Sequence, residues 1–113
     1  MLTSTRPLLF GYLRLRISDS PDAVDTGRQL LRDFADAEGF ALVDVFVDAD
    51  ENTPQAALAA LIRCVQDADV HLSGIAVAVP DLGHLGANAV TQRQMRARIQ
   101  TEARVRVVVP AGR

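Results

Sequence analysis

The sequence has no tryptophan, no lysine, one cysteine and few aromatic residues. Aromatic side chains make up 4% of the 113 residues and apolar residues 49%, so the core must consist of Leu, Val, Ile and Ala. Cys64 cannot form an internal disulfide or belong to a closed zinc site, and we expect it to be a small buried residue on a helix. No apolar run reaches the roughly 20 residues of a membrane span, and no signal peptide is evident. We therefore expect a cytoplasmic protein without membrane contact.

Charged residues are unevenly distributed around a net charge of -2. Acids dominate from Asp19 to Glu51, whereas from Arg93 onward Glu102 is the only acid among several arginines. A basic third helix is compatible with nucleic-acid contact. However, glutamines separate its arginines and no aromatic residue is interleaved, so the pattern favours a solvated helix face over a DNA-binding surface.

Apolar periodicity and turn residues predict a regular alternation of strands and helices. Ser20-Pro21-Asp22 is a typical helix start, Gly39 a typical helix end, and Asn52-Thr53-Pro54 a second helix start. Met95, Ile99 and Ala103 share one face of a third, more polar helix. The predicted strands are 8–17, 40–47, 72–79 and 105–109, and the second helix is expected to end near Asp69.

This alternation predicts one α/β domain over residues 1–113: a three-layer, mostly parallel, four-stranded sheet with helices on both faces, in a flavodoxin-like layout. Ligands of such sheets bind beyond the carboxyl ends of the strands. The loops that follow Ile17, Val47 and Val79 are therefore the places to look for a site.

The end of the first strand carries polar residues at alternate positions. Tyr12, Arg14, Arg16 and Ser18 share one strand face, which places two guanidinium groups on the same side. Neighbouring cations require an anion or a carboxylate between them. The pattern thus indicates either an anion site or a surface ion-pair cluster with Asp19 or Asp48, and the commoner ion pair is favoured.

Two other groups are candidate ligands. Asp44, Asp48, Asp50 and Glu51 could suggest a hard-cation site at the end of the second strand. Only Asp48 lies clearly at the strand end, and we interpret the others as exposed turn residues, so we expect no metal and no cofactor. His71 and His84 are far apart in sequence, and we interpret His84 as an exposed loop residue that could contact an anion when protonated.

Several fragments, in order, resemble one known family. They are Gly11-Tyr12-Leu13-Arg14, Gln29 with Leu30-Leu31, the turn at 35–40, Val45-Phe46-Val47-Asp48, the helix at 58–65 and Pro80-Asp81-Leu82. Together they resemble the catalytic domain of the serine recombinases (resolvases and invertases) over nearly the whole chain. The resemblance implies the resolvase-like fold, a serine that attacks a DNA phosphate, and arginines with an aspartate that stabilise charge and handle protons.

The sequence departs from that family pattern at most catalytic positions. In the register set by Gly11-Tyr12, Arg14 matches the first family arginine, but Arg16 stands where the nucleophilic serine belongs. Further along, Gly83 replaces the aspartate, and His84 and Ala87 replace arginines. Gln55 also stands where the family has an arginine. A shifted register would align Arg16-Ile17-Ser18 with the family Arg-Val-Ser and keep Ser18 as the nucleophile.

The resemblance and its departures favour a pseudoenzyme. We expect a non-catalytic, recombinase-like domain that acts as a regulatory or protein-interaction module, as a homo-oligomer or with another protein. One alternative is DNA strand cleavage and exchange by Ser18. A second is phosphate or nucleotide binding by Tyr12, Arg14, Arg16 and His84, with the first helix N-terminus as a natural anion site. Because the sequence ends soon after the fourth strand, we also expect the long dimer helix and the DNA-binding domain of the family to be absent.

Overall fold

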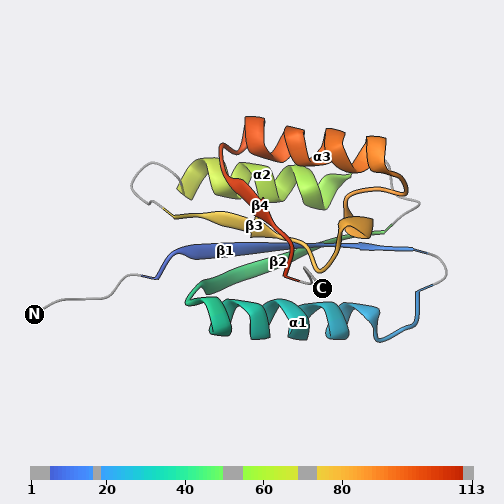
Figure 1. The fold of residues 1–113 in the computed structure, drawn as a ribbon, viewed down its shortest axis with the longest axis horizontal. Helices are drawn as coiled ribbons and strands as arrows, with labels where there is room; N and C mark the ends of the chain where they lie inside the picture. The colour runs from blue at the N-terminus through green and yellow to red at the C-terminus, as the bar shows by residue number, and fades with distance from the viewer. Residues whose placement is uncertain (1–5, 17–18, 50–54, 69–73, 111–113) are drawn as a thin grey trace, which may run out of the picture.

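A computed structural model of the chain describes residues 6–16, 19–49, 55–68 and 74–110. Strands and helices alternate along it, and a short 3-10 helix, η1, interrupts the alternation (Figure 1). In chain order the elements are β1 (Leu8–Leu15), α1 (Ala23–Glu38), β2 (Ala41–Ala49), α2 (Ala56–Ala68), β3 (Ala76–Ala78), η1 (Leu82–His84), α3 (Ala89–Glu102) and β4 (Arg106–Val108). The predicted alternation is confirmed.

The four strands form one parallel sheet in the order β2-β1-β3-β4. Helix α1 covers one face, and α2 and α3 cover the other (Figure 1). Gly39 ends α1 in the left-handed conformation, with φ 79°, as its position in the sequence predicts. The predicted fold class, a three-layer α/β domain with helices on both faces, is confirmed.

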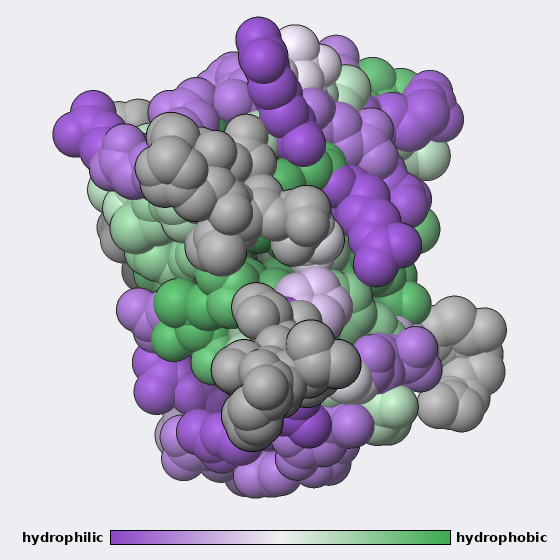
Figure 2. Space-filling model, turned by 90° about the vertical axis from the view of Figure 1, so that its left-hand side faces the viewer, coloured by the Kyte–Doolittle hydropathy of each residue, from purple (hydrophilic) through white to green (hydrophobic). Residues whose placement is uncertain are grey.

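Side-chain alternation along β1 divides the core into two layers. Leu9 and Leu13 pack toward α1 with Leu31 and Ala35, whereas Phe10 and Tyr12 pack toward α2 and α3. Gly11 belongs to the α1 side, where a Cβ atom would lie 2.6 Å from the Leu31 side chain. The absence of a side chain at Gly11 therefore allows α1 to approach the sheet closely. Seen from the amino ends of the strands, hydrophobic residues show between two hydrophilic layers (Figure 2).

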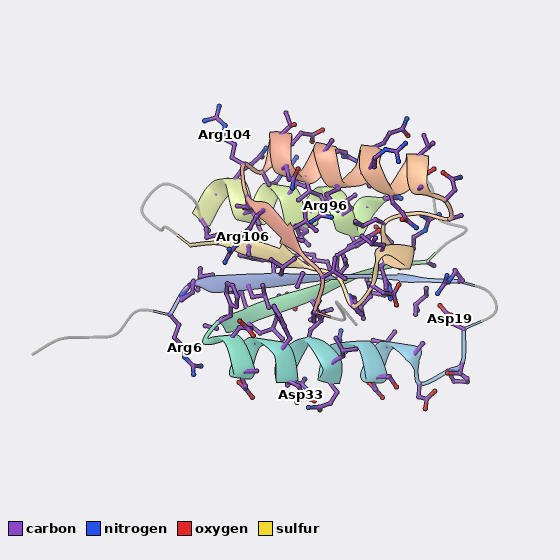
Figure 3. The ribbon with its side chains drawn as sticks, viewed as in Figure 1. Arg6, Asp19, Asp33, Arg96, Arg104 and Arg106 are labelled. Carbon is purple, nitrogen blue, oxygen red and sulfur yellow. The ribbon has the colours of Figure 1, made fainter. Side chains whose placement is uncertain are left out.

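Both edges of the sheet carry polar contacts to the backbone. On β2, Leu42 pairs with Leu9 and Asp44 pairs with Phe10, so Val43 is an extra, bulged residue. Next to it, the Asp44 carboxylate accepts the N–H of Val45 at 2.7 Å. On β4, Arg96 from α3 donates to the carbonyl of Val107 at 3.0 Å (Figure 3).

The structure differs from the sequence-based expectations in two places. Cys64 is exposed on α2 rather than buried, because Leu61, Ile62 and Val65 form the buried stripe and Cys64 lies on the opposite side of the helix. Strand β3 is shorter than the expected 72–79 strand, of which residues 72 and 73 lie outside the described residues. The proposed helix start at 52–54, the acids Asp50 and Glu51, and His71 also lie outside them. In the described part of the chain, no helix combines the length and apolar character needed to cross a membrane.

Candidate functional site

A cleft of about 280 Å³ lies at the carboxyl end of β1, between the start of α1 and the loop that follows β3. Its base is apolar, and its rim carries charged and hydroxyl side chains. The lining residues are Leu13, Leu15, Arg16, Asp19, Ser20, Ala23, Thr26, Gly27, Leu30, Pro80, Asp81 and His84. The cleft is where parallel α/β sheets bind their ligands, as the sequence predicts.

Tyr12 and Asp48 form a buried polar pair, and Tyr12 packs on the face of the sheet that α2 and α3 cover; neither residue is among those that line the cleft. The Tyr12 hydroxyl donates to Asp48 Oδ2 at 2.8 Å, and the exposed fractions are 1% and 4%. The same carboxylate accepts the backbone N–H groups of Ala57 at 2.9 Å and Leu58 at 3.0 Å. Burial raises the pKa of the Tyr12 phenol well above its ordinary value, and the hydrogen bond to Asp48 and its charge raise it further. The pair therefore ties β1, β2 and the first turn of α2 together.

Arg16 lies in the turn that follows β1. Its backbone N–H donates to Asp19 Oδ2 at 2.7 Å, and its guanidinium Nε lies 3.8 Å from Asp19 Oδ1. Asp19 lies at the end of the molecule opposite Arg6 (Figure 3). The guanidinium also lies close to Gly83, since a Cβ atom there would be 3.5 Å from Arg16 Nη1. The ion pair between Arg16 and Asp19 that the sequence favours is present.

Of Arg14 and Arg16, the second is among the residues that line this cleft. Strand β1 ends at Leu15, and the next residue, Arg16, lines the cleft. Arg14, within the strand, is not among the described residues that line this cleft. Arg14 lies near Tyr12, where its positive charge acts to lower the pKa of the phenol. Ser18, the nucleophile of the alternative register, lies outside the described residues. Of the alternating residues, Tyr12 is thus buried in the core, whereas Arg16 lies at the rim of the cleft.

His84 is half-buried, not the exposed loop residue that the sequence suggests. Its Nδ1 atom accepts the backbone N–H of Arg14 at 2.9 Å, across 70 positions of sequence. Burial lowers the pKa of the imidazole below its ordinary value; Arg16 lowers it further, and Asp81 and Asp19 act in the opposite direction. Because Nδ1 is an acceptor, the neutral ring carries its proton on Nε2.

The rim of the cleft therefore holds charges of both signs. Arg16 is positive, Asp19 and Asp81 are negative, and a His84 ring that accepts a hydrogen bond contributes no charge. Asp81 also accepts the N–H of Gly83 at 2.8 Å and begins η1. Within the described ranges, no group of three His, Cys, Asp or Glu side chains could hold a metal ion. Such a rim suits polar contacts more than the binding of a highly charged anion.

The sequence did not predict the roles of two residues, Asp48 and His84. Asp48 was a candidate cation ligand, but the hydrogen bonds that it accepts from Tyr12 and from the start of α2 make it a structural residue. The sequence offered no local signal for this role, because Asp48 lies nine and ten positions before the two helix N–H groups that it accepts. The contact between His84 and Arg14 had no local signal, since it joins two distant segments.

No protein-family model and no curated protein matches the chain. Several solved structures are similar to it, among them two catalytic domains. One is the C-terminal catalytic domain of ISC1926 TnpA, an IS607-like serine recombinase, with a TM-score of 0.70 and 21% identity over 91% of this chain and 67% of that one. The other is the N-terminal catalytic domain of TP901-1 integrase, with a TM-score of 0.70 and 18% identity over 92% of this chain and 77% of that one. The chain therefore has the fold of the serine recombinase catalytic domains, as its resemblance in sequence implies.

Proposed function

We propose that this chain is a recombinase-fold domain that does not cleave DNA and acts instead by binding a second copy of itself, in a regulatory or interaction role. The observation that carries the proposal is the position of Arg16 and its contacts with Asp19. In the register set by Gly11-Tyr12 it occupies the position of the nucleophile, and a guanidinium is not a nucleophile. Its turn is closed on Asp19, both through the backbone and through the side chain.

The charges of the cleft support the same proposal. Phosphoryl transfer needs several fixed positive groups around the reacting oxygens. The described rim offers Arg16, and it opposes this charge with Asp19 and Asp81. His84, which replaces a family arginine, is engaged as an acceptor and has a lowered pKa, so it adds no positive charge near neutral pH.

The loss of charged side chains from the expected catalytic positions lowers the stabilisation of the transition state. Removal of one charge-stabilising donor costs about 3 kcal/mol of transition-state stabilisation, which is roughly a hundredfold in rate. Gly83, Ala87 and Gln55 each lack the charged group expected from the family at that position. Several such losses together leave no useful rate of cleavage, even where a nucleophile is present.

A second candidate is DNA strand cleavage with Ser18 as the nucleophile. It is favoured by the likeness of the fold to two serine recombinase catalytic domains. It also relies on the shifted register, which aligns Arg16-Ile17-Ser18 with the family Arg-Val-Ser and gives up the match at Gly11-Tyr12-Leu13-Arg14. Under this alternative, Arg14 and Arg16 would face the phosphate of a bound DNA strand. It requires the Asp19 carboxylate to release Arg16 when DNA binds.

One pair of experiments separates the two candidates. The chain is incubated with supercoiled plasmid DNA and examined for a covalent protein–DNA adduct, with Ser18→Ala as the matched control. We expect no adduct with either protein. In parallel, sedimentation velocity over a range of concentrations should show a reversible dimer. An adduct that Ser18→Ala abolishes would overturn the proposal, and a chain that stays monomeric at all concentrations would contradict its binding role.

A further inference from the structure

The end of β1 has neighbours of different kinds on its two sides. On one side β2 pairs with it along its whole length, from Leu8 to Leu15. On the other side β3 pairs only with residues Leu9 to Gly11. Beyond Gly11, the backbone of β1 therefore has no strand partner on the β3 side within the described chain, and its N–H groups there need other acceptors.

His84 supplies one of these acceptors. The chain leaves β3 at Ala78, passes Pro80 and Asp81, and forms η1, which places the imidazole beside the end of β1. The bond from the Arg14 N–H to His84 Nδ1 is 2.9 Å long and partly buried. A side chain thus continues the contact that a longer β3 strand would make.

This acceptor differs from a backbone carbonyl in one respect: it can be protonated near physiological pH. A protonated imidazole has two N–H donors and no acceptor, so it cannot bond to the Arg14 N–H. Two donors would then face each other in a partly buried position, and the local structure must change.

We propose that His84 is a pH-sensitive latch: the neutral ring holds the Leu82–His84 turn against the end of β1, and protonation releases that turn. His84 belongs to the released turn and Asp81 directly precedes it, and both residues line the strand-end cleft. Acidification therefore changes the shape and the charge of the cleft together. This role of the His84 imidazole does not depend on whether the domain cleaves DNA.

The surroundings of the ring set the direction of the effect. Burial and Arg16 favour the neutral form, whereas Asp81, at the start of η1, and Asp19, in the β1–α1 turn, favour the protonated form. The net pKa is lowered in the folded chain, so between this value and the ordinary value of about 6.5 the unfolded chain binds more protons. The contribution of the neutral His84 ring to stability is therefore complete above about pH 6.5, and it is lost as the pH falls through the lowered pKa. The turn is held against β1 above this range and released below it.

Amide hydrogen exchange of Arg14, followed by NMR between pH 5 and 8 and corrected for intrinsic rates, tests the latch. We expect protection of this amide to fall roughly tenfold on acidification, with a midpoint below about pH 6.5, since the amide loses one hydrogen bond. The imidazole nitrogen shifts of His84 in the same samples should show the Nε2–H form above the midpoint.

Two variants complete the experiment. His84→Gln keeps a side-chain acceptor but removes the titration, so protection of the Arg14 amide should become independent of pH. His71→Gln removes the only other histidine and should leave the wild-type profile unchanged. The proposal fails if protection does not fall in the wild type, if the fall persists in His84→Gln, or if His71→Gln removes it. If His84→Gln does not fold, the imidazole shifts of the wild type still decide: an Nδ1–H form above the midpoint overturns the latch.

Discussion

Two polar pairs lie in opposite surroundings: an inner pair that begins on β1 and an outer pair in the turn that follows β1. Tyr12 and Asp48 are 1% and 4% exposed, and a 2.8 Å hydrogen bond joins them. Four positions later, the Arg16 and Asp19 side chains are 50% and 22% exposed, and their closest charged atoms are 3.8 Å apart. Water can replace the partner of either residue in the outer pair, but not in the inner one. A pair of polar side chains near a strand end therefore says little about stability until its burial is known.

The largest expected effect is that of Asp48→Ala. The substitution leaves the Tyr12 hydroxyl and two backbone N–H groups of α2 without their acceptor in a buried place, which should lower the free energy of unfolding by about 3 kcal/mol or more. Urea denaturation measures this loss. Asp44→Ala, on the same strand but exposed, is the matched control and should cost less than about 1 kcal/mol. Equal losses in the two variants would contradict the idea that burial of the carboxylate determines how much it stabilises the fold.

Tyr12→Phe should have an intermediate effect, about 2 kcal/mol, because Asp48 keeps the two helix N–H donors. The variant also tests how the free energy of unfolding changes at alkaline pH. Since the pKa of Tyr12 is raised on folding, its contribution is complete below about pH 10 and is lost as pH rises above that value. Tyr12 is the only tyrosine and the chain has no tryptophan, so tyrosinate absorbance reports it alone. A phenol that titrates normally in the folded chain would contradict its burial.

Arg16→Ala should have the smallest effect, within about 0.5 kcal/mol, because the guanidinium is half exposed and its ion pair is solvated. Added salt should change the stability of the variant and of the wild type almost equally. The variant also tests phosphate binding at the cleft. We expect inorganic phosphate to leave both melting temperatures unchanged, whereas a rise in the wild type that Arg16→Ala abolishes would restore the anion-site alternative.

Much of the fold could be predicted from the sequence, because its signals are local. The alternating residues of β1 and the left-handed Gly39 depend on neighbours a few positions away. The helix start at Ser20-Pro21-Asp22 was predicted only approximately, because α1 begins at Ala23 and the Ser20 hydroxyl donates to Asp22 instead of capping the helix. The short length of β3 could not be predicted, since the apolar run before Pro80 does not say how much of it pairs. The exposure of Cys64 was missed because the residue was judged by its type. The periodic apolar residues of the same helix, among them Leu61 and Val65, form a buried stripe that leaves Cys64 outside it.

The site was harder to predict than the fold. The ion pair of Arg16 and Asp19 spans three positions and was expected. The contact of His84 with the Arg14 amide joins segments whose meeting depends on where β3 ends and how η1 folds back. Asp48 was noticed as a carboxylate at a strand end, but its two roles, toward Tyr12 and toward α2, emerge only when both elements are in place.

The polar contacts at the two sheet edges bear on how this chain behaves at high concentration. Open strand edges are templates on which further strands add, and repeated addition leads to fibrils. Here the Val45 N–H is occupied by Asp44 beside a bulge, and the Val107 carbonyl is occupied by Arg96. Growth by strand addition is thus interrupted at both ends of the sheet. These contacts therefore disfavour pairing of strand edges between copies and favour helix surfaces or loops as the contact of any second copy.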